Sequence, residues 1–163
     1  MNTSTTLSSN LLADYVNPVI LATRDVFAMM LDCTPRRVGL KVKDHAGCRN
    51  SVSGVIGITG RTVGTIVLSL PTPVAIEVLK RMVGTEADSI THEVCDAVGE
   101  LTNMIAGAAK AKLGHLELSL SLPNVVSGES YDVSYPSDVS PFCILFESEI
   151  GAFAIEAGFT KVS

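Results

Sequence analysis

Apolar residues recur at helical spacing near the start of the chain, after ten mostly polar residues that are rich in Ser and Thr. The polar stretch predicts a flexible leader over residues 1–10, and we expect the domain itself over residues 11–163. Pro18 either starts the first helix, with Asn17 as its N-cap, or lies inside a longer helix. The spacing predicts that this helix begins near residue 11 and uses the apolar positions Leu12, Tyr15, Val16, Val19, Ile20, Val26, Phe27, Met30 and Leu31.

A different pattern follows the Thr34-Pro35 break. Apolar and polar residues alternate over 38–43, which is the period of a half-buried strand. The stretches 54–59 and 62–70 are rich in Val, Ile and Thr, and Gly60-Arg61 between them predicts a tight hairpin turn. Two prolines end this run, and the apolar spacing after them predicts a short second helix that is closed by Gly84.

The second half of the chain repeats the order of a helix followed by strands. A third helix is expected from about Thr91 to Leu113, with a strand over 116–120 and a loop over 121–140 that can hold a short strand at Val133. A closing hairpin is expected over 142–157. Because strands occur in runs joined by short turns, the sequence predicts an α+β single domain with a mostly antiparallel sheet, packed helices and an internal pseudo-repeat.

Composition narrows the class of protein. The chain has 163 residues, of which 47% are hydrophobic and 18% charged, so one domain with a sizeable core is expected, and some apolar surface should be covered by a partner or a second copy. The net charge of −5 argues against a nucleic-acid partner. The chain has no apolar run near the roughly 20 residues of a membrane span and no secretory signal at its start, so we expect a cytoplasmic protein without membrane insertion.

The cysteines and histidines are scattered. Four cysteines occur without a CxxC pair and are expected to remain thiols, at Cys33, Cys48, Cys95 and Cys143. Three histidines show no HxxxH or HExxH spacing, at His45, His92 and His115. We therefore predict no metal ligands on this chain.

The third helix carries the candidate chemistry. At about 100° per residue, its apolar positions from Val94 to Ala108 form one stripe. The opposite face holds Glu100 and Asn103, three residues apart and therefore side by side. A carboxamide can hold an attacking water and a carboxylate can bind a cation, so both are candidate catalytic residues. By itself, however, the ExxN spacing arises often by chance, and exposed Glu and Asn on a helix are normally only solvated. The pair is surrounded by small residues, Gly99, Thr102, Ala106 and Gly107. Either a docking partner or close packing within the domain explains the two glycines among them.

Two segments of the chain resemble a known family. The sequence DAVGELTNMIAGAAKAKL ends at Leu113, and LSLPNVVSG ends at Gly128. Together they resemble the CheC, CheX and FliY family of chemotaxis phosphatases, whose signature is ExxN within G-E-L-x-N-x-x-x-G, with P-x-V-V-x-G downstream. The similarity extends to Asn17-Pro18 and to the glycine-rich segment 54–60.

The resemblance implies a phosphatase that acts on the phospho-aspartate of a CheY-like receiver domain. Asn103 would orient the attacking water and Glu100 would engage a lysine of the receiver, which also supplies Mg²⁺, so no cofactor is expected on this chain. The family further implies a homodimer built through the sheet. A single ExxN places the chain nearer CheX, because Asp14 and Asn17 form only a DxxN pair that Pro18 follows directly.

Two other functions fit parts of the pattern. The chain could bind a receiver or another chemotaxis partner without catalysis, as a sequestering or scaffold protein, although the presence of both Glu100 and Asn103 speaks against this. A structural dimer of the flagellar-switch type would need partner-binding segments for which the chain shows no room. An assay of receiver dephosphorylation separates these functions.

Overall fold

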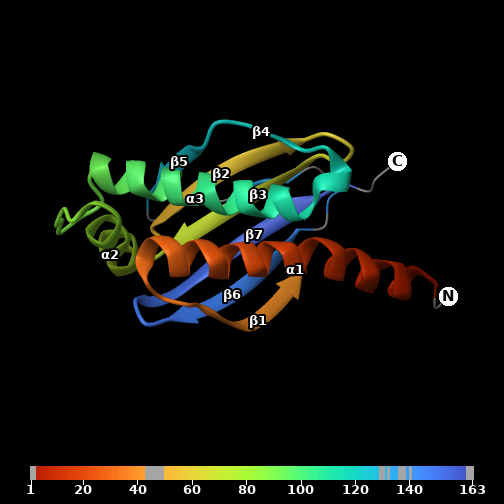
Figure 1. Cartoon of the computed structure of the whole chain (residues 1–163), viewed down its shortest axis with the longest axis horizontal. Helices are drawn as coiled ribbons and strands as arrows, with labels where there is room; N and C mark the ends of the chain where they lie inside the picture. The colour runs from red at the N-terminus through yellow and green to blue at the C-terminus, as the bar shows by residue number, and fades with distance from the viewer. Residues whose placement is uncertain are drawn as a thin grey trace.

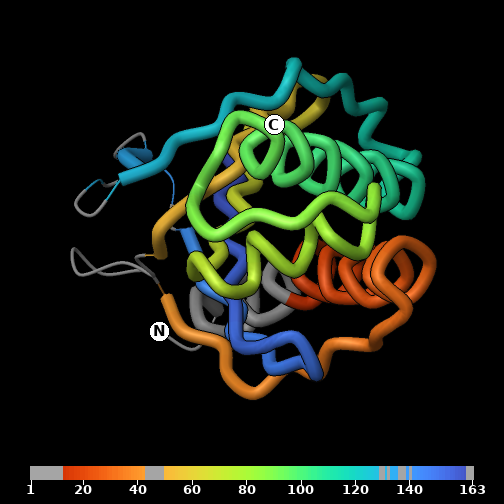
Figure 2. Tube along the Cα trace, turned by 90° about the vertical axis from the view of Figure 1, so that its left-hand side faces the viewer, coloured from red at the N-terminus to blue at the C-terminus, as the bar shows by residue number. Residues whose placement is uncertain are grey.

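The computed structural model describes residues 3–42, 50–128, 131, 133–135, 139 and 141–160, with side chains from residue 13 onward. It has the predicted α+β architecture, in which three α-helices lie on one face of a seven-stranded antiparallel sheet (Figure 1). Figure 2, turned by 90°, shows α1 and α3 side by side on the same side of the sheet. None of the helices in the described part of the chain combines the length and apolar character needed to cross a bilayer.

The helices and strands have the following bounds. The helices are α1 (Thr3–Leu31), α2 (Thr72–Val83), α3 (His92–Lys112) and the 3₁₀ turn η1 (Gly114–Leu116). The strands are β1 (Arg36–Val42), β2 (Val52–Thr59), β3 (Gly64–Leu70), β4 (Ser119–Leu120), β5 (Asn124–Ser127), β6 (Phe142–Ser148) and β7 (Gly151–Phe159). Their order in the sheet is β1-β6-β7-β3-β2-β4, and β5 also pairs with β2.

The helix α1 contains Pro18 in its interior, so of the two alternatives the longer helix is the one observed. It begins at Thr3, earlier than the apolar spacing predicts. Its buried stripe packs on the sheet, where Phe27 stacks on Phe153 with 4.5 Å between the ring centroids. Tertiary packing of this stripe stabilises a helix that intrinsic propensity alone would not extend across a proline.

Gly84 closes α2 as predicted, whereas α3 ends at Lys112 with Leu113 as its C-cap, at a φ of −115°. Gly84 follows α2 with a φ of 74°, a left-handed conformation that suits glycine, and its N–H donates to Lys80 O. Thr91 is the N-cap of α3, and its hydroxyl oxygen accepts a hydrogen bond of 3.2 Å from the backbone N–H of Val94. The predicted hairpins β2–β3 and β6–β7 are also present.

The segment after α3 differs from its prediction. Residues 116–120 were expected to form one strand, but only Ser119–Leu120 pairs with β2, after a 3₁₀ turn that ends at Glu117 with a φ of 50°. Leu116 and Leu118 are both buried at this turn, so their alternation with polar residues in the sequence does not reflect a strand. Within the expected loop, β5 forms by pairing with β2, whereas Val133 is not in a strand. Pairing with a distant strand decided both outcomes.

The cysteine prediction is wrong in part. Cys143 is disulfide-bonded, whereas Cys33 and Cys95 are free. His45 and Cys48 lie outside the described residues.

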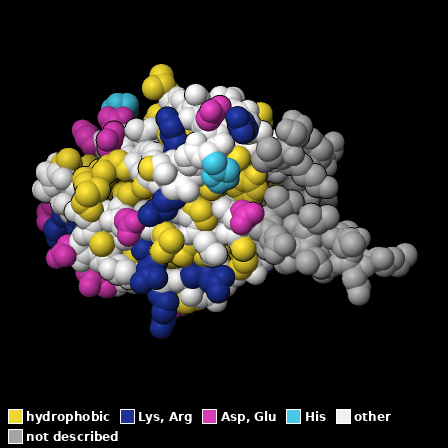
Figure 3. Space-filling model, turned by 45° about the vertical axis from the view of Figure 1, so that its right-hand side comes forward, with side chains coloured by type: hydrophobic (Ala, Val, Ile, Leu, Met, Phe, Trp, Pro, Cys, Tyr) yellow, Lys and Arg dark blue, Asp and Glu magenta, His cyan; other side chains and the backbone are white. Residues whose placement is uncertain are grey.

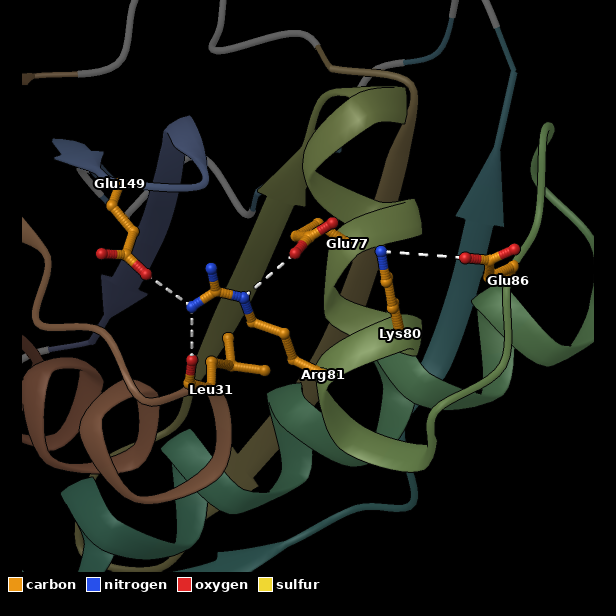
Figure 4. Close-up of polar contacts among 6 residues, drawn as sticks. All are labelled: Leu31, Glu77, Lys80, Arg81, Glu86 and Glu149. Carbon is orange, nitrogen blue, oxygen red and sulfur yellow. Dashed lines mark hydrogen bonds and ion pairs between the residues drawn. The ribbon is translucent and has the colours of Figure 1, made fainter.

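Arg81 joins three parts of the fold at one end of the helical layer (Figure 4). Its guanidinium donates to the Leu31 carbonyl at the end of α1 at 2.8 Å and to the Glu149 carboxylate in the β6–β7 turn at 2.7 Å. Its Nε donates to Glu77 on α2 at 3.1 Å. Lys80 lies 3.8 Å from Glu86 on the following loop. The planar, multiply donating guanidinium therefore ties α1, α2 and the sheet together.

The helix α3 packs closely on β2 at Gly54. A Cβ atom added to Gly54 would lie 2.8 Å from Thr102 Cβ and would collide with Thr102 Oγ1. Thr102 is fully buried, and its hydroxyl donates to the Val98 carbonyl at 2.6 Å, so it cannot easily turn away. The distance between α3 and the sheet is thus set by a residue without a side chain.

We predict that Gly54→Ala lowers the free energy of unfolding by about 1–3 kcal/mol, because the added methyl group overpacks the contact with Thr102. Urea denaturation measures the change. Gly57→Ala, on the same strand, is the matched control, since its Cβ would lie at an ordinary 3.5 Å from Ser121 Oγ. Equal stability of the two variants would show that Gly54 does not set the position of α3.

Candidate functional site

The helix α3 is held firmly on one face and presents the other to solvent. Its buried face places Val94, Val98, Leu101 and Ile105 in the core at 0% exposure. Both ends of the helix are fixed, by the Thr91 cap and by an ion pair of 3.3 Å between Lys112 and Asp25 on α1. Side chains on the exposed face therefore project from a rigid element.

Glu100 and Asn103 both lie on this exposed face, as the sequence predicts. Neither side chain makes a hydrogen bond or an ion pair with another residue of the described part of the chain. Residues three apart on a helix are neighbours, so the carboxylate and the carboxamide can act on the same bound group. The pair is thus available to a ligand, with no internal contact to break.

The charges along α3 are unequal. Its exposed first half carries Glu93, Asp96 and Glu100, whereas Lys110 and Lys112 lie in its last turn. Figure 3 shows acidic side chains gathered toward one end of the molecule, with exposed apolar side chains beside them. Asp96 lies 3.5 Å from Nε2 of His92, one turn earlier. Glu100, by contrast, lies next to the Asn103 carboxamide and has no histidine beside it of the kind that Asp96 has.

The segment before β5 borders the same helix. A Cβ atom added to Gly99 would lie 3.2 Å from Val125 Cγ2 and 3.9 Å from Pro123. Leu122 precedes this contact and is 85% exposed. The sequence did not predict this contact with Gly99, because the positions of Pro123 and Val125 depend on pairing between β5 and β2; the P-x-V-V-x-G motif was the available signal.

The second pair considered in the sequence lies on a different helix. Asp14 and Asn17 are exposed on α1, with Pro18 following inside the helix. They belong to a different helix from Glu100 and Asn103.

The described residues contain no group of three or more His, Cys, Asp or Glu side chains that could hold a metal ion. Burial raises the pKa of the Cys95 thiol on α3, and the nearby Asp96 raises it further. Burial likewise raises the pKa of Cys33. Both thiols are therefore less readily ionised than an exposed cysteine and are poor nucleophiles.

A hollow of about 250 Å³ in the described part of the chain is formed without α3 or the exposed pair, and its lining residues are Lys41, Asn50, Pro71, Leu145, Ala152, Phe153 and Ala154. Small-molecule sites are usually concave, whereas Glu100 and Asn103 stand on a convex helix. This geometry suits a macromolecular partner that supplies its own pocket.

Known proteins share this fold and most of this sequence pattern. The chain is 29% identical over 147 residues to the CheY-P phosphatase CheX of Thermotoga maritima, covering 88% of this chain and 91% of that protein. A CheC-like superfamily protein from a Shewanella species superposes with a TM-score of 0.83 at 30% identity, covering 91% and 98% of the two chains.

A second solved structure has the same fold at lower identity. The CheX–CheY–BeF₃–Mg²⁺ complex from Borrelia burgdorferi matches with a TM-score of 0.72 at 21% identity, covering 90% of this chain and 96% of that one. The family model described as chemotaxis phosphatase CheX matches residues 52–147, a range that contains β2, β3, α2 and all of α3. The chain therefore belongs to the CheX family of chemotaxis phosphatases.

Proposed function

We propose that the chain is a phosphatase that removes the phosphoryl group from the phospho-aspartate of a CheY-like response regulator. The observation that carries this proposal is the exposed Glu100 and Asn103 pair on a rigid convex helix, in a member of the CheX family. The Thermotoga relative is a CheY-P phosphatase, and the Borrelia protein of the same fold is known in complex with CheY, BeF₃ and Mg²⁺.

Asn103 would position the nucleophile. Its carboxamide oxygen accepts a hydrogen bond from a water molecule while its N–H groups donate to a phosphoryl oxygen, which aligns the water with the bond between phosphorus and the aspartate oxygen. The water oxygen forms the new bond to phosphorus, the aspartate carboxylate leaves, and inorganic phosphate is released. Mg²⁺ on the receiver offsets the charge on the phosphoryl oxygens, so this chain needs no metal of its own.

Glu100 would hold the receiver in place. Its carboxylate lies beside Asn103 and has no partner in the described part of the chain, so it is free to pair with a lysine ammonium of the receiver. Docking excludes water from such a contact and strengthens it relative to an ordinary surface ion pair. Glu100 thus supports both affinity and alignment.

We predict that Asn103→Ala lowers the acceleration of receiver dephosphorylation by about 10²-fold or more, because a positioning group is lost. The measurement is single-turnover decay of phosphorylated receiver, with circular dichroism to confirm that α3 is intact. Retained binding of the receiver by this variant separates catalysis from docking. Activity within about twofold of wild type would rule out a catalytic role for Asn103.

For Glu100→Gln, we expect weaker binding and slower turnover, together about tenfold or more, because a charged pair is removed from a desolvated contact. Helix stability should change little, since Gln and Glu have similar propensities. Asp96→Asn is the matched control, one turn earlier on the same face. If Asp96→Asn impairs turnover and Glu100→Gln does not, the acidic residue of the motif has been assigned incorrectly.

We further propose that two copies associate through the edge of the sheet. The strand β1 is at the end of the strand order, so its outer backbone groups are unpaired within the described sheet. Its apolar residues Val38, Leu40 and Val42 are 48%, 40% and 65% exposed. An exposed edge of this kind is commonly protected by pairing with a second chain.

Sedimentation equilibrium at micromolar concentration should give twice the chain mass of 17.1 kDa. Leu40→Lys should shift the protein toward the monomer, because it places a charge in the expected interface. Leu21→Lys, a substitution on α1 at a residue of similar 47% exposure, should not. A strictly monomeric wild-type protein would rule out this association.

A further inference from the structure

The two glycines near the middle of α3 have different surroundings. Gly99 is packed within the domain, because a Cβ atom there would meet Val125 Cγ2 at 3.2 Å. Gly107 is half-buried, yet a Cβ atom there would meet no described atom within 4 Å other than its chain neighbours and the backbone of its own helix. The fold therefore explains the first glycine and does not explain the second.

A glycine without a packing reason is unfavourable inside a helix. Gly107 lies five residues before the end of α3, and its φ is not in the left-handed region that would favour glycine. Alanine would form a more stable helix at this position, because it loses less backbone entropy on folding. If the absence of a side chain at Gly107 has a function, the reason lies in a contact with something outside the described chain.

The position of Gly107 indicates what that use is. It follows Asn103 by four residues and Glu100 by seven, so all three lie along one side of the helix, with Gly107 about 6 Å along the axis from Asn103. The asparagine side chain is short. For Asn103 to reach a water that touches a phosphoryl group buried in a partner, the partner's backbone must come close to the surface of α3.

We propose that Gly107 is a specificity-determining residue of this site, over which a backbone segment bordering the phosphorylated pocket of the receiver packs in direct contact with α3. This inference rests on the proposed phosphatase function. It adds a steric requirement to the two polar contacts, because a side chain at this position would hold the receiver away from Asn103.

Gly107→Ala should therefore change stability and activity in opposite directions. The midpoint of thermal unfolding should rise by about 1–4 °C, as for an exposed helical glycine replaced by alanine in a chain of this size. Binding to a CheY receiver loaded with Mg²⁺ and beryllofluoride should weaken by about fivefold or more, since one added methyl overpacks a close contact. Gly107→Val should weaken binding further, and the rise in KM should exceed the fall in kcat.

Gly114→Ala is the matched control. A Cβ atom at Gly114 would also meet nothing within 4 Å, but this residue lies beyond the end of α3, away from Glu100 and Asn103. Binding of the receiver should be the same as for the wild type. If Gly114→Ala weakens binding as much as Gly107→Ala, the effect is not specific to the contact and the inference fails.

Wild type and Asn103→Ala measured in the same assay keep the two proposals apart. If the wild-type chain neither binds nor dephosphorylates the receiver, the phosphatase function fails and this inference fails with it. If the wild type is active and Gly107→Ala is stabilised with unchanged binding, Gly107 faces only water and the inference alone is overturned. A change in the dimer mass of Gly107→Ala without loss of receiver binding would instead assign this surface to a second copy of the chain.

Discussion

The close contact between Gly54 on β2 and Thr102 on α3 fixes the depth at which the central helix sits on the sheet. Because Thr102 is buried and bonded to its own helix, the contact leaves little freedom for α3 to shift or rotate. Its neighbour Asn103 consequently points outward at a defined angle. A surface site on a single helix is only as precise as the packing beneath it, and here that packing depends on the absence of a side chain.

The rest of the fold supports this arrangement from the ends. Arg81 fastens α2 to the end of α1 and to the β6–β7 turn, and residues 84–91 connect α2 to α3. The ion pair between Lys112 and Asp25 joins the other end of α3 to α1. Exposed ion pairs contribute little stability individually, so burial of the apolar stripe of α3 supplies most of the free energy that holds this helix on the fold. The polar contacts fix its orientation.

A convex site places particular demands on its partner. Among the described residues, no cluster of side chains could hold a metal ion. In the proposed function, the receiver supplies the phosphoryl group, the metal and the pocket, and Glu100 and Asn103 supply alignment. In such a division, surface shape next to the polar pair matters as much as the pair itself, which is why an unneeded glycine beside it is informative.

The sequence by itself determined the end of α2, the two hairpins and the exposed position of Glu100 and Asn103, since local periodicity and the Gly84 cap act within a few residues. Only the tertiary structure decided that Pro18 lies inside α1, that residues 116–120 split and that β5 forms, because each depends on a distant sheet or strand. It also separated Gly99 from Gly107. Both are helical glycines in the sequence, and what would contact their missing side chains is a property of the folded chain alone.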